Sequence, residues 1–98
     1  MQWTGLAVLL LKQQHSSRAE GYVGAFAAVA CEGPSLADVT LKLSDEFLDN
    51  EFHLVGFEHF LPVDMLDREL TNEENSLISK LSEFPVQFRN VHFHKGDA

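Results

Sequence analysis

The chain has 98 residues, of which 45% are hydrophobic and 22% charged, and its formal net charge is −8 at pH 7. The length predicts a single domain over residues 1–98, and the elements described below make it an α+β domain. The composition is that of a globular protein rather than a disordered one. Twelve of the acidic residues lie between Glu32 and Glu74, where only Lys42 and Arg68 oppose them. Because nucleic-acid binding needs clustered Lys and Arg, this charge argues against a nucleic-acid partner and leaves cations, basic proteins or uncharged partners.

The first third of the chain predicts a β-hairpin. Leu6–Lys12 and Tyr22–Cys31 are continuous apolar runs, and the polar residues 13–21 connect them. Strands that are apolar on both sides are covered on both faces of a sheet, although a helix is not excluded for the alanine-rich second run. Leu6–Leu11 is too short to cross a bilayer and follows no basic residue, so we expect a soluble, cytoplasmic protein without a membrane partner.

Cys31 is the single cysteine. It cannot form an intramolecular disulfide or belong to a zinc site built from several thiolates. The residue follows the apolar run Ala27–Ala30, and no base lies near it in the sequence. We therefore interpret it as a small buried hydrophobic residue rather than a nucleophile.

Two segments carry the start signals of helices. Ser35 is a suitable N-cap with Asp38 three residues later, and the spacing of apolar residues predicts a helix over 35–50. Thr71 and Glu74 form a capping box before a second helix, which Pro85 ends. The expected buried stripes are Leu36, Val39, Leu43 and Phe47 in the first helix, and Leu77, Ile78, Leu81 and Phe84 in the second.

A third strand is expected over Phe52–Val63. Regular alternation would place His59 on one face with Val55, Phe57, Leu61 and Val63, and would place Glu58 on the other. Among such neighbours we interpret His59 as a core residue with one satisfied hydrogen bond. It would be a general base only if an acidic residue oriented its ring.

The last strand is expected over Val86–Lys95. Val86 and Phe88 alternate regularly, but Val91 and Phe93 are out of phase with them. A β-bulge near Arg89 and Asn90 would place all four apolar residues on one face.

The resulting order is β-β-α-β-α-β, which predicts a two-layer sandwich with a four-stranded sheet and both helices on one face. Two strand–helix–strand units favour right-handed crossovers between parallel strands. The fold is similar to ferredoxin-like domains in size and layering only, because their order is β-α-β-β-α-β. The uncovered face of the apolar hairpin strands predicts a homodimer.

Two groups of residues are candidate sites. His92 and His94 are two apart on a strand and point the same way, so both could bind zinc or another divalent metal, although nothing fixes a third ligand. They could equally be solvent-facing histidines without a metal. The second group would line a pocket for a small apolar ligand, or simply fill the core. It consists of Phe26, Phe57, Phe60 and Phe88.

No phosphate-binding loop, Gly-x-Ser-x-Gly elbow or dinucleotide fingerprint is present in the sequence. We therefore expect a non-enzymatic protein-interaction module that acts as a homodimer and needs no cofactor. Binding of a basic protein would require the acidic side chains to converge on one surface. The alternatives are a metal-binding protein that uses His92 and His94, and a domain that binds a small apolar ligand.

Overall fold

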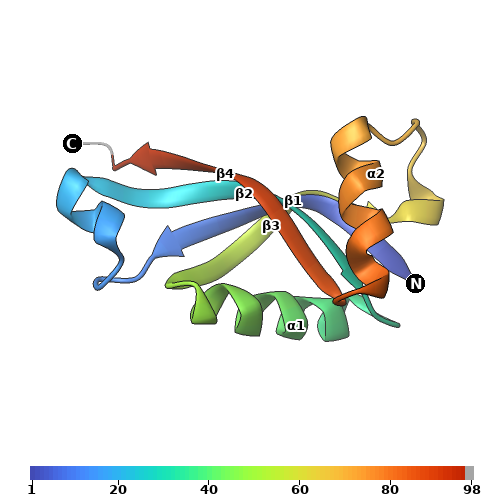
Figure 1. Cartoon of the computed structure of the whole chain (residues 1–98), viewed down its shortest axis with the longest axis horizontal. Helices are drawn as coiled ribbons and strands as arrows, with labels where there is room; N and C mark the ends of the chain where they lie inside the picture. The colour runs from blue at the N-terminus through green and yellow to red at the C-terminus, as the bar shows by residue number, and fades with distance from the viewer. Residues whose placement is uncertain (97–98) are drawn as a thin grey trace.

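A computed structural model describes residues 1–96 of the chain (Figure 1). Its regular elements follow the predicted order β-β-α-β-α-β, and the alanine-rich second run is a strand. Three short 3-10 turns lie between them. The elements are β1 (Gln2–Leu11), η1 (Ser16–Glu20), β2 (Tyr22–Glu32), α1 (Leu36–Asp49), β3 (Phe52–Pro62), η2 (Val63–Met65), α2 (Asn72–Ser79), η3 (Lys80–Ser82) and β4 (Val86–Lys95).

The four strands form one sheet in the order β3-β1-β2-β4, and every ladder is antiparallel. The expected pairing of parallel strands is therefore wrong. β2 and β3 run in the same direction, but β1 lies between them, and β3 and β4 are at opposite edges of the sheet. The physical reason is that the β1–β2 hairpin forms the centre, so each later strand joins a free edge of the hairpin.

Helix α1 covers one face of the sheet. Its buried residues Val39, Leu43 and Phe47 pack against alternate residues of β1 and β2, among which alanines allow a close approach. The Ser35 hydroxyl accepts a hydrogen bond from the Asp38 amide at 3.2 Å, which confirms the predicted N-cap. Cys31 is fully buried in this core, so its interpretation as a small buried residue is confirmed. Burial also raises the pKa of its thiol to about 11.

Helix α2 packs on the opposite face of the sheet. Leu77 and Leu81 pack with Ala30, which points away from its neighbours Val29 and Cys31 in the α1 core. The prediction that both helices lie on the same face of the sheet is therefore wrong. The sheet and α1 form the two layers, and the short α2 covers one end of the second face. Because α1 already occupies its own face, the remaining apolar surface for α2 is on the other side.

The predicted bulge in β4 is confirmed. Asn90 has a φ of 56°, and the register of β4 against β2 shifts at this point. Val86, Phe88 and Phe93 consequently pair with residues of β2 that face α1. The bulge thus corrects the phase of the apolar residues as expected.

Strand β3 contains two register shifts that regular alternation did not predict. At one of them His59 and Phe60 both lie opposite Gly5, and His59 has a φ of 52°. Phe60 packs toward the α1 core, whereas His59 is exposed. The prediction of His59 as a core residue is therefore wrong, because the bulge changes the face on which it lies.

Within residues 1–96, no helix combines the length and the apolar character needed to cross a membrane.

Candidate functional site

The face that carries α2, here called the open face, is crossed by four rows of residues running from β3 to β4. Residues that pair directly in antiparallel ladders share a face, so the register defines these rows. Helix α2 lies over the first row, and the second row contributes to a groove. We call the last two rows the uncovered end. The rows are Leu61–Thr4–Ala30–Gln87, Glu58–Leu6–Ala28–Arg89, Gly56–Val8–Phe26–His92 and His53–Leu10–Gly24–His94.

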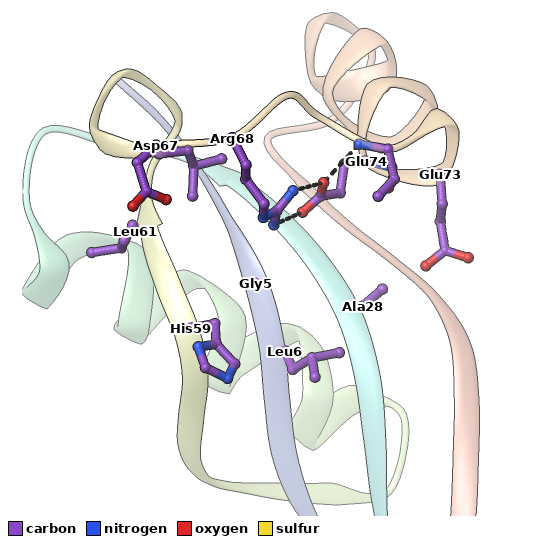
Figure 2. Close-up of a pocket in the computed structure, with 11 residues that line it drawn as sticks. Gly5, Leu6, Ala28, His59, Leu61, Asp67, Arg68, Glu73 and Glu74 are labelled. Carbon is purple, nitrogen blue, oxygen red and sulfur yellow. Dashed lines mark hydrogen bonds and ion pairs between the residues drawn. The ribbon is translucent and has the colours of Figure 1, made fainter.

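The groove has a volume of about 480 Å³ and lies between the open face and the connection from β3 to α2 (Figure 2). Its floor is apolar, and its rim carries charged and polar groups. The floor consists of Gly5, Leu6, Ala28 and Leu61 of the sheet, and Leu66 of the connection adds an apolar side chain above it. The rim consists of His59, Asp67, Arg68, Thr71, Glu73 and Glu74.

Arg68 and Glu74 form a bidentate ion pair on the rim, with N–O distances of 2.7 and 2.8 Å. The Glu74 carboxylate also accepts a hydrogen bond from the Thr71 amide, and the Thr71 hydroxyl accepts one from the Glu74 amide. The predicted capping box is therefore confirmed. Hydrogen bonding to Arg68, reinforced by the Thr71 amide, lowers the pKa of Glu74 to about 2. The pair fixes the connection above the groove.

The other two carboxylates of the rim, those of Asp67 and Glu73, form no ion pair of this kind within the described part of the chain. The ion pairs found among residues 1–96 are Arg68–Glu74 and Lys42–Asp38, and neither includes Asp67 or Glu73. The Asn90 side-chain amide donates a hydrogen bond to Glu73, which links α2 to the bulge of β4. The groove thus combines an apolar floor with a rim of net negative charge.

His59 enters the groove because of the close contact between β1 and β3. A Cβ atom on Gly5 would lie 2.6 Å from the Cα of Phe60 and 2.7 Å from the carbonyl oxygen of His59. Only glycine allows this approach, and the resulting bulge turns the His59 ring toward the groove (Figure 2). The sequence signal that could have identified the bulge is Gly5 itself, because a glycine beside an apolar run often marks such an irregularity.

The predicted metal ligands His92 and His94 do lie on one face, paired with Phe26 and Gly24. The His94 ring lies above Gly24, and its centroid is 5.3 Å from that of Phe26. No group of three or more His, Cys, Asp or Glu side chains within residues 1–96 could hold a metal ion. The metal site therefore stays a prediction, with two ligands from one chain.

The four phenylalanines that could line an apolar pocket do not all lie on one face of the sheet. Phe57 and Phe60 stack with centroids 4.1 Å apart, and Phe88 packs on Phe47 at 4.8 Å, all on the α1 side. Phe26 lies on the open face, where it pairs with Val8. None of the four lines the groove. Strand alternation separates Phe26 from the other three, whereas the bulge at His59 brings Phe60 to the side of Phe57.

The acidic side chains do not converge on a single surface. One group lies along α1, on the far side of the sheet from the groove. The second group lies on the β3–α2 connection and the first turn of α2, around the groove. The first group is Asp38, Asp45, Glu46 and Asp49; the second is Asp64, Asp67, Glu69, Glu73 and Glu74.

Comparisons with protein-family models, with curated protein sequences and with solved structures gave no match. The chemistry of the groove and of the open face is accordingly the basis for the function that we propose.

Proposed function

We propose that the protein is an interaction module whose groove binds a short basic, partly apolar segment of a partner protein. This differs from docking on one broad acidic surface, which the division of the acidic side chains between α1 and the groove excludes. One observation carries this proposal: Asp67 and Glu73, which belong to no ion pair found among residues 1–96, lie on the rim around an apolar floor. The side chains of Lys and Arg combine a long apolar stem with a charged head. The apolar stems would lie along Leu6 and Leu61, and separate cationic heads would reach Asp67 on one side of the groove and Glu73 on the other (Figure 2).

A cation fits the groove better than a neutral ligand does. A neutral apolar ligand would remove water from Asp67 and Glu73 without replacing its hydrogen bonds, which costs free energy. Two cationic heads of a basic segment compensate the two carboxylates, one each, through charge-assisted hydrogen bonds. The net charge of −8 also accelerates encounter with a basic partner, and this effect weakens as salt concentration rises.

We assign no reaction to the groove. Its lining holds no Ser, Cys or Lys that His59 could activate. The hydroxyl of Thr71 is engaged as the N-cap of α2. Binding, rather than catalysis, is what these side chains support.

The test compares two labelled peptides of equal length, one alternating Lys with Leu and one alternating Glu with Leu, by fluorescence anisotropy. The Lys/Leu peptide is expected to bind, and the double variant Asp67→Asn/Glu73→Gln to weaken its binding about tenfold, or 1.4 kcal/mol. The matched control is Asp45→Asn/Asp49→Asn on α1, which changes the net charge equally. Equal weakening by the control, or equal binding of the Glu/Leu peptide, would contradict a specific site in the groove.

A further inference from the structure

The uncovered end of the open face has an apolar centre. Leu10 is 49% exposed, and Val8 and Phe26 are half-buried. Helix α2 lies toward the other end of the sheet, so it leaves these side chains uncovered (Figure 1). Contiguous exposed apolar side chains of this kind mark contact surfaces.

The uncovered end is also the part of the open face without carboxylates. Its two rows hold glycine, apolar residues and the three histidines His53, His92 and His94. The next row already contains Glu58, and the groove beyond it carries a negative rim. Because each chain has a net charge of −8, two copies repel each other through most of their surface. The uncovered end is where two copies can meet without apposing carboxylates.

We propose that the uncovered ends of two copies pack face to face, and that the dimer holds one divalent metal ion of the zinc class through His92 and His94 of both copies. The two-fold axis lies between the sheets and runs across the strands. This orientation places each α2 beyond the free end of the other copy instead of between the two sheets. The inference does not depend on the groove or on its basic partner.

The two-fold axis completes a site that one chain leaves incomplete. It sets the row of His92 opposite the row of His94 of the second copy, and Val8 opposite Leu10 of the second copy. Sheets that pack face to face are about 10 Å apart, so imidazoles from both sides can reach a common ion. A structural zinc site takes four ligands in a tetrahedron, and two histidines from each copy supply them.

His94, like His92, is exposed on the open face, where a second copy can reach it. Its ring lies above Gly24 and beside Phe26, so it is held over the open face rather than beyond the edge of β4. The ring atoms nearest Gly24 are Cε1 and Nε2, so Nε2 must turn away from the sheet before it binds an ion held between two copies.

The test is native mass spectrometry of the full chain, first in EDTA and then with stoichiometric Zn²⁺. The expected species is a dimer with one zinc per two chains, and zinc is expected to tighten dimerisation at least tenfold. His92→Ala/His94→Ala should lose the bound zinc. His53→Ala is the matched control, because His53 lies in the row of His94 but at the opposite edge of the sheet. This variant should leave zinc binding unchanged. Leu10→Glu should give monomers, whereas Leu41→Glu, on the exposed side of α1, should not.

A dimer that takes up no zinc would overturn the metal site, as would retention of zinc by the His92→Ala/His94→Ala variant. A monomer in both conditions, or one zinc per monomer, would overturn the assembly. Loss of zinc in His53→Ala would overturn the proposed two-fold axis. A zinc ligand at His53 would require β3 of one copy to lie over β4 of the other, whereas the proposed axis places β4 over β4. Circular dichroism of each variant verifies that the fold is retained.

Discussion

Replacing Gly5 by alanine tests the contact that shapes both β3 and the groove. The new Cβ would lie 2.6 Å from the Cα of Phe60 and 2.7 Å from the carbonyl oxygen of His59. Favourable contacts between carbon atoms are about 3.5 to 4.0 Å long. Both opposing atoms belong to the backbone, so no side-chain rotation relieves the overlap. Strands β1 and β3 must separate by about 1 Å, or the bulge must rearrange.

The expected destabilisation is about 2 to 3 kcal/mol. Overpacking of this kind costs about 1 to 3 kcal/mol, and weakened ladder hydrogen bonds around the bulge add about 1 kcal/mol each. Phe60 would also shift from its stacks on Trp3 at 5.6 Å and on Phe57 at 4.1 Å. The reduced freedom of the unfolded chain offsets about 0.4 to 1 kcal/mol. The melting temperature should fall by roughly 10 to 20 °C.

Urea unfolding followed by Trp3 fluorescence measures this difference, because the indole is buried in the folded chain. Gly56→Ala is the matched control: the same substitution on β3 meets no atom within 4 Å. We expect its free energy of unfolding to stay within about 0.5 kcal/mol of the parent. The steric explanation of the bulge would be refuted if the free energy of unfolding of Gly5→Ala also stayed within about 0.5 kcal/mol of the parent. Equal destabilisation by both variants would refute it as well.

Three further predictions concern other parts of the fold. Because the pKa of Glu74 falls from 4.5 to about 2 on folding, its contribution to stability is present above about pH 4.5 and is lost as pH falls toward 2; acid unfolding curves of Arg68→Ala should show a smaller loss over this range. The thiol of Cys31 should react with a thiol reagent at pH 8 only at the rate of unfolding, and at once in denaturant, because it is buried with a pKa of about 11; fast reaction of the native chain would contradict this. Phe47→Ala should lower the free energy of unfolding by about 3 to 5 kcal/mol, and Leu41→Ala, at a side chain 68% exposed, by less than about 0.5 kcal/mol; similar losses in both would contradict the assigned core.

Interactions between residues close in the chain were predictable from the sequence. The N-cap at Ser35 and the capping box of Thr71 and Glu74 each join residues three positions apart, so their residue types suffice to locate both helix starts. The bulge at Asn90 could be located because it restores the phase of apolar residues within one strand. The element order and the burial of Cys31 followed from the same local patterns.

The candidate site depends on contacts between residues distant in the chain. His59 reaches the groove because the backbone of β3 crowds Gly5, more than 50 positions earlier, and no periodicity within β3 records that contact. The sequence indicated the acidic segment. It did not indicate that one part of this segment lies on α1, on the far side of the sheet, while Asp67 and Glu73 line the groove with Leu6 and Leu61.

Composition, capping and periodicity thus predicted the elements of this protein and where both helices begin, whereas β1 begins at Gln2 and not at the expected Leu6. Only the tertiary structure decided the order of the strands, the face that α2 covers and the groove between them. The physical reason is that an apolar stripe specifies how much surface must be buried, and not which of two apolar faces will bury it. In the folded chain α1 packs on one side of the β1–β2 hairpin and α2 on the other.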